Sequence, residues 1–249
     1  MLRSQISTTE TILGHRIPEA ALSMSGPDEG SHYGSPVADI VRKAFSLVGL
    51  GYTQIIAYSY YGEPLLYPEN SIMAAHNLGL CHPYNVSSEY CLGPGRRDRL
   101  GREQDYMVGY YTDALEVILT SPTALAYSVT PYPYADYELG ENMRQQNPDE
   151  SFYWEQVRHL LSTPLLRHVW KPTRVVMYGD RSNDTQMQQL SKGVLKAFLA
   201  DEEQPDWVKD KVNPVFAGAM GAAEFTKREL FWNKEKPISE LASPPKVYL

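Results

Sequence analysis

The chain has 249 residues, of which 43% are hydrophobic and 21% charged, and its formal net charge is −7. This length suits one large domain or two small lobes. The acidic balance argues against nucleic acid as a partner, and no stretch approaches the roughly 18 apolar residues of a membrane span. Because residues 1–6 also lack an apolar signal core, we expect a cytoplasmic protein with no membrane partner.

The first third of the chain predicts short helices that alternate with short strands. Ser35-Pro36 places a capping residue before a proline at the first helical position, and Gly49 is a typical helix end. Ser71 is the expected cap of a later helix. We expect helices at 3–13, 36–48 and 71–80, and strands at 17–24 and 52–60.

Residues 81–104 predict an irregular loop, whose segment 93–101 is rich in glycine and arginine. The arginines either bind an anion or form a solvated charged tip. Cys81 and Cys91 are either free thiols or a disulfide. Together with His76 and His82 they fit no zinc spacing, so we predict no metal site.

The middle of the chain predicts a hairpin, with strands at 105–111 and 114–120. Residues 123–130 can extend this sheet. A long tyrosine-rich connection is expected at 131–147, and Asn147-Pro148 then opens a helix. The chain has 18 Tyr and 6 Phe, and tyrosine suits clefts and interfaces as well as partly exposed surface.

The last third predicts a strand, a turn and two helices. Thr173-Arg-Val-Val-Met-Tyr178 is a short apolar run typical of a buried strand. From Thr185 onward, apolar residues recur at the spacing of a helix. Asn213-Pro214 opens a helix whose centre, 217–223, consists almost entirely of small residues. Gly218 and Gly221 each cost such a helix roughly 1 kcal/mol, so we expect another element to approach it closely.

Two of these motifs resemble the ATPase domain of the 70-kDa heat-shock chaperones. Val175-Val-Met-Tyr-Gly179-Asp-Arg-Ser182 resembles the adenosine-binding segment of that family, and Asn213-Pro-Val-Phe-Ala-Gly-Ala-Met-Gly221-Ala-Ala223 resembles its closing helix. Ile12-Leu-Gly-His-Arg-Ile17-Pro18 resembles the entry to its first strand. The likeness is greatest to divergent heat-shock-like proteins of filamentous fungi. It implies an α/β, actin-like/heat-shock ATPase-type fold, in which a mixed sheet is flanked by helices.

The resemblance also implies a domain plan and an assembly. Residues 1–104 correspond to a partial first lobe, 105–236 to a ribonuclease-H-like second lobe, and 237–249 to an extended tail. The first phosphate loop of the family has no room in this chain, which implies an N-terminally truncated first lobe. The missing strands would leave sheet uncovered, so we expect a homodimer.

The nucleotide motifs of the family are degenerate here. Met107-Val-Gly-Tyr-Tyr-Thr112 stands where the family has an Asp, three glycines and a Thr. Phosphate loops need glycine because backbone N–H groups must approach the phosphates closely. Asp180 also replaces a glycine of the adenosine turn. We therefore expect no ATP hydrolysis and no cofactor.

The resemblance places nine candidate residues around a cleft narrowed by tyrosine, which suits a compact, largely apolar ligand. We predict a cofactor-free cyclase or isomerase of secondary metabolism. Alternatives are a non-catalytic pseudo-ATPase that binds proteins, or a residual chaperone. Asp180 is a possible base or the cap of the following helix. The candidate catalytic residues are Tyr110, Tyr111, Asp113, Asp180 and Arg181, and the candidate ligand-binding residues are Gly109, Thr112, Tyr178 and Gly179.

Overall fold

The computed structural model describes residues 2–23, 36–52, 67–79, 103–122 and 128–235. Several predictions lie outside these residues: most of the strand at 52–60, the irregular loop with its arginines, both cysteines, and the extended tail.

The core of the molecule is a mixed five-stranded sheet with the order β5-β4-β3-β6-β7. The strands are β3 (Asp105–Tyr110), β4 (Leu115–Pro122), β5 (Ser128–Asp136), β6 (Arg174–Tyr178) and β7 (Asp206–Trp207). β3, β4 and β5 form an antiparallel meander, whereas β6 is parallel to β3 and β7 is parallel to β6. The predicted hairpin and the predicted strand at 173–178 are both confirmed.

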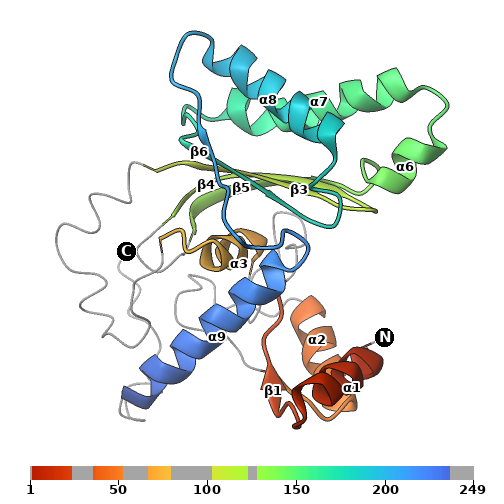
Figure 1. Cartoon of the computed structure of the whole chain (residues 1–249), viewed down its shortest axis with the longest axis vertical. Coiled ribbons are helices and arrows are strands. Elements are labelled where there is room, and N and C mark those ends of the chain that lie inside the picture. Colours follow the sequence, from red (N-terminus) through yellow and green to blue (C-terminus); the bar gives the residue numbers. More distant parts are fainter. Residues whose placement is uncertain (1, 24–35, 53–66, 80–102, 123–127, 236–249) are drawn as a thin grey trace.

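Helices cover both faces of this sheet (Figure 1). One face carries α7 (Glu150–Arg167) and α8 (Thr185–Leu199). The other carries α3 (Pro68–Ala75) and α9 (Ala217–Glu235). The short helix α6 (Glu141–Gln146) lies between β5 and α7 in the chain. The structure thus confirms a mixed sheet flanked by helices.

Side chains alternate along each strand, so successive residues pack on opposite faces of the sheet. In β3, Tyr106, Val108 and Tyr110 belong to the apolar cluster beneath α7 and α8. Met107, between them, belongs to the cluster beneath α3 and α9. In β6, Val175 joins the first cluster, while Val176 and Tyr178 join the second.

The N-terminal elements form a smaller unit with an apolar cluster of its own. α1 (Leu2–Leu13) and α2 (Pro36–Leu47) accompany a parallel pair of short strands, β1 (Glu19–Ala20) and β2 (Gly51–Tyr52). Val41, Phe45 and Leu50 are the buried members of this cluster. Gly14 and Gly49 follow the two helices with positive φ. Gly49 is thus confirmed as a helix end, and Gly14 ends the helix that was expected at 3–13.

Several predicted boundaries are wrong. β5 runs through Pro131 and Pro133, where a connection was expected; it is an edge strand, and an edge tolerates residues without an N–H. α3 begins at Pro68, and the Ser71 hydroxyl donates to the Pro68 carbonyl oxygen instead of capping the helix. Asp149, two residues beyond the expected Asn147, caps α7.

The expected close approach to the last helix is confirmed at Gly221. A Cβ on Gly221 would lie 1.7 Å from the carbonyl oxygen of Ser71 in α3. At Gly218 a Cβ would meet nothing within 4 Å. Gly221 therefore allows α9 to cross α3 at very short range, whereas Gly218 leaves open space beside that crossing.

In the part of the chain that the structure describes, no helix combines the length and apolar character needed to cross a membrane.

Candidate functional site

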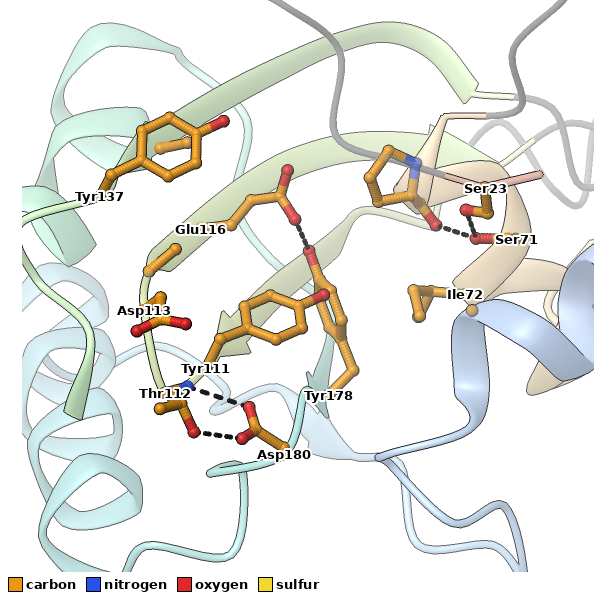
Figure 2. A pocket seen from close by; sticks show the side chains of 14 residues that line it. Ser23, Ser71, Ile72, Tyr111, Thr112, Asp113, Glu116, Tyr137, Tyr178 and Asp180 are labelled. Carbon is orange, nitrogen blue, oxygen red and sulfur yellow. Dashed lines mark hydrogen bonds between the residues drawn. The ribbon is translucent and has the colours of Figure 1, made fainter. Parts of the chain in front are cut away.

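A cavity of about 470 Å³ lies on the α3/α9 face of the sheet (Figure 2). Its walls come from the turn between β3 and β4, the end of β6, the first turns of α3, and the start of α9. Its volume falls within the range typical of small-molecule sites. Segments far apart in the sequence meet here, as they do in most ligand-binding pockets.

The floor of the cavity is a row of residues that runs across three strands. Gly109 on β3 pairs with Glu116 on β4 and with Tyr178 on β6. The Tyr178 ring lies over Gly109, where a Cβ would be 2.7 Å from ring atoms. The Tyr178 hydroxyl thereby reaches across β3 and donates to Glu116 Oε2 at 2.7 Å (Figure 2). The candidate Gly109 serves the site by leaving room for this ring.

Glu116 and Tyr178 are both deeply buried, with exposed fractions of 4% and 1%. Burial raises the pKa of Tyr178 well above its ordinary value, and the charge of Glu116 raises it further. Tyr178 therefore stays protonated and holds the Glu116 carboxylate in place as a hydrogen-bond donor.

Tyr111 stands beside this pair at the end of β3. Its ring meets that of Tyr178 edge to face, with centroids 6.0 Å apart and an interplanar angle of 83°. Burial raises the pKa of Tyr111, and the charges of Glu116 and Asp180 add to the effect. Tyr111 therefore presents a protonated hydroxyl near a buried carboxylate, and the two rings give the cavity an aromatic wall (Figure 2).

A clasp between Thr112 and Asp180 joins the β3–β4 turn to the end of β6. Asp180 Oδ1 accepts from the backbone N–H of Thr112 at 3.0 Å, and Oδ2 accepts from its hydroxyl. The idea that Asp180 caps the following helix is wrong, because Asp184 does so by accepting from the N–H of Met187. Asp180 lines the cavity with its carboxylate held against the hairpin turn.

Asp113 and Arg181 occupy more exposed positions. Asp113 lines the cavity and accepts from the side-chain amide of Asn142 at 2.6 Å. The exposed Arg181 donates to the Thr112 hydroxyl at 3.3 Å and lies 4.0 Å from Asp180. Arg181 thus touches the clasp but does not itself line the cavity.

The structure places Tyr110 on the opposite face of the sheet, which corrects its predicted position at the rim of the cleft. Its side chain is fully buried beneath α7, and its hydroxyl donates to Glu141 at 2.9 Å. Arg144 binds the same Glu141 carboxylate. Strand alternation explains the error, since Tyr110 and Tyr111 are neighbours and cannot both face the cavity.

Gly179 shapes the turn after β6. Its φ is +96°, and a Cβ would lie 2.3 Å from the Tyr110 carbonyl oxygen. The same oxygen accepts from the N–H of Arg181 at 3.0 Å. Gly179 therefore allows the turn to fold back over β3 and deliver Asp180 to Thr112.

The structure brings together five candidates around one cavity: Tyr111, Thr112, Asp113, Tyr178 and Asp180. Glu116 was missed, although strand alternation already assigns it to the face of Met107 and Gly109. Tyr137 and Gly218 were also missed, because their places depend on how distant segments pack.

Glu69 is a second buried carboxyl group near the site, on the first turn of α3. It is 2% exposed. Burial raises its pKa to about 8; the N–H of its own backbone opposes this shift, while Glu116 adds to it. Glu69 is therefore protonated at neutral pH. Among the described residues, no three His, Cys, Asp or Glu side chains gather closely enough to hold a metal ion.

Neither models of known protein families nor curated protein sequences give a match to this chain.

Proposed function

We propose that the chain is a degenerate heat-shock-ATPase-like shell, without ATPase activity, whose cavity is the active site of a cofactor-free cyclase or isomerase. The substrate is a small, largely apolar organic molecule. The observation that supports an enzymatic function is the buried Glu116–Tyr178 pair beneath the aromatic wall of the cavity.

The strand order supports the ribonuclease-H-like part of this proposal. An antiparallel meander is followed by two parallel strands, which are reached through α7 and α8. That is the strand arrangement of a ribonuclease-H-like lobe, the repeated unit of actin-like ATPases. The turn between β3 and β4 then corresponds to the second phosphate loop.

The clasp argues against nucleotide binding at that turn. A phosphate loop offers free backbone N–H groups to the phosphates. Here the N–H of Thr112 is taken by the Asp180 carboxylate. An approaching phosphate would meet this negative charge instead of a donor, and Asp113 and Glu116 would add to the repulsion.

Proton transfer is the chemistry that the buried pair can perform. Glu116 takes a proton from a carbon of the bound substrate and returns it at a different position, so the substrate is isomerised without net gain or loss of atoms. The Tyr111 hydroxyl donates to a substrate carbonyl oxygen as negative charge develops there. Tyr178 is a positioning residue, because it acts by orienting Glu116. A general base of this kind contributes about 10²–10⁴ in rate.

Two measurements test the proposal. Titration calorimetry with Mg-ATP should give no binding heat, and binding at micromolar affinity would refute the loss of the nucleotide site. Metabolite extract of the source organism should lose one component and gain an isomer of equal mass when incubated with the protein. The Glu116→Gln variant should abolish this conversion.

Glu203→Gln is the matched control, because it makes the same chemical change at an exposed position in the loop after α8. It should convert the extract at the wild-type rate. Undiminished conversion by Glu116→Gln would refute the role of the buried pair.

A protein-interaction module is a second candidate, and exposed apolar side chains at the start of α9 favour it. Phe216 is 57% exposed and Met220 44%, and they lie four residues apart. A Phe216→Ser/Met220→Ser variant should convert the extract as wild type does if the cavity is an active site. Lack of conversion by the wild type, together with a partner lost in this variant, would favour the second candidate.

A further inference from the structure

Two tyrosines of the cavity, Tyr111 and Tyr137, lie at the same level of the sheet. β3 and β5 run in the same direction, because both are antiparallel to β4. Each tyrosine comes one residue after the last residue of its strand, and both of those last residues pair with Leu115. Ala114 is the next residue of this row on β4, and its carbonyl oxygen accepts from the N–H of Tyr111 at 2.9 Å. The row is therefore tyrosine, alanine, tyrosine.

The spacing of this row leaves room for one ring. Tyr111, Ala114 and Tyr137 all line the cavity, so they lie on the same face of the sheet. Adjacent strands are about 4.8 Å apart, which places the two tyrosines about 10 Å apart across β4. A flat ring in contact with a second ring on each side needs about 7–8 Å. Between the tyrosines Ala114 contributes only a methyl group, so the row forms a slot with aromatic walls (Figure 2).

Tyr137 forms the outer wall of this slot. It is 69% exposed although it lines the cavity, so most of its ring is open to a ligand. The backbone beside it is anchored: the N–H of Glu138 donates to Asp136 Oδ1 at 2.7 Å, and the Leu139 carbonyl oxygen accepts from the Tyr153 hydroxyl at 2.9 Å. A tyrosine on an anchored backbone offers a large contact surface and loses little conformational freedom when it binds a ligand.

We propose that the ligand of this cavity carries a flat, unsaturated ring, which lies between Tyr111 and Tyr137 above Ala114. This inference rests on the proposed function and names its substrate class. Tyr111 is the fixed inner wall, because its ring packs edge to face against that of Tyr178. Tyr137 determines specificity, because its ring contacts the ligand and has no part in the proton transfer. Stacking favours a flat ring over a saturated ring of the same skeleton by about threefold to tenfold for each wall.

A pair of neutral probes tests the preference for a flat ring: 2-naphthalenemethanol and its fully saturated analogue, decahydro-2-naphthalenemethanol. They share one carbon skeleton and one hydroxyl group. The saturated probe has the larger apolar surface, so burial alone would favour it. Ligand-observed NMR titration of the full chain should give at least about fivefold tighter binding for the aromatic probe. Equal binding of the two probes, or no binding of the aromatic probe, would overturn the inference.

Variants locate this preference at Tyr137. Tyr137→Leu keeps an apolar side chain but removes the ring, so it should weaken binding of the aromatic probe about threefold to tenfold and change binding of the saturated probe less than about twofold. Tyr137→Phe keeps the ring and should bind both probes as wild type does. Because Tyr137 is an exposed residue, neither change disturbs the core.

Phe152→Leu is the matched control. It also replaces an aromatic ring with leucine at an exposed position, but on α7, which covers the opposite face of the sheet. This variant should bind both probes as wild type does. An aromatic preference that survives in Tyr137→Leu would overturn the inference, as would an equal loss in Phe152→Leu.

The two proposals fail in different ways. A flat-ring preference that depends on Tyr137, without any conversion of the extract, would refute the enzyme and leave the ligand class. Conversion of a component that has no unsaturated ring, at an undiminished rate in Tyr137→Leu, would refute the ligand class and leave the enzyme.

Discussion

Replacing Gly221 with alanine tests whether the crossing of α3 and α9 is as close as the structure requires. The added Cβ would lie 1.7 Å from the Ser71 carbonyl oxygen, 2.4 Å from its carbonyl carbon and 2.8 Å from its Cα. These are backbone atoms of a helix, so no side chain can rotate away. The helices must separate by well over 1 Å to restore ordinary contact.

The energetic consequence has two parts with opposite signs. Alanine favours the helical backbone by about 1 kcal/mol relative to glycine. Overpacking against backbone costs about 3 kcal/mol or more, because moving the two helices apart by this distance weakens their contacts along the whole crossing. We therefore expect Gly221→Ala to lower the free energy of unfolding by about 2–4 kcal/mol, and the melting temperature by roughly 4–16 °C.

Urea denaturation followed by circular dichroism measures this change, and Gly193→Ala is the matched control. Gly193 lies within α8, where a Cβ would meet nothing within 4 Å. The control should raise stability by about 0.5–1 kcal/mol. A Gly221→Ala protein as stable as wild type would refute the close crossing.

Three further predictions concern the sheet and its surroundings. Gly109→Ala should destabilise the fold by about 1–3 kcal/mol, because its Cβ would displace the Tyr178 ring; an unchanged denaturation midpoint would contradict this. Between about pH 4.5 and 8 stability should fall by roughly 3–5 kcal/mol, because folded Glu69 keeps a proton that the unfolded chain releases. Glu69→Gln should flatten the pH profile of the melting temperature, and an unchanged slope would argue against a protonated Glu69. Arg144→Met should lower the free energy of unfolding in urea by about 2 kcal/mol, because Arg144 binds three carboxylates. Lys171→Met removes an exposed ion pair and should lower it by under about 0.5 kcal/mol. Equal losses in the two variants would refute the prediction.

The sequence predicted most of the sheet because its strands carry local signals. The apolar run at 173–178 and the hairpin at 105–120 both have β-branched or aromatic residues bounded by turns. Residues 123–130 were expected to extend the sheet, but the continuation of β5 to Asp136 was missed. Its two prolines normally argue against a strand, and only the edge position makes them acceptable. The two-residue strand β7 has too little sequence to show any periodicity.

The candidate site was predicted in part. The sequence showed which turns form the site, but it did not show where each side chain points. The motif likeness drew attention to the turns at 109–113 and 178–181, and five of its residues do surround one cavity. A motif comparison takes no account of strand alternation, by which the neighbours Tyr110 and Tyr111 point to opposite faces of the sheet. Motif comparison cannot find Glu116. Once the strand is known, however, its neighbours Leu115 and Val117 pack toward α7 and α8, so alternation places Glu116 on the opposite face, where the cavity lies.

The crossing of α3 and α9 also sets an order of events in folding. The β3–β4 hairpin pairs residues that are close in sequence, so it closes a short loop and can form early. Residues 68–75 and 217–235 must instead meet across most of the chain. During synthesis the hairpin emerges complete long before Gly221 does. The cavity therefore cannot exist on a nascent chain, and any ligand can bind only after the last helix has docked.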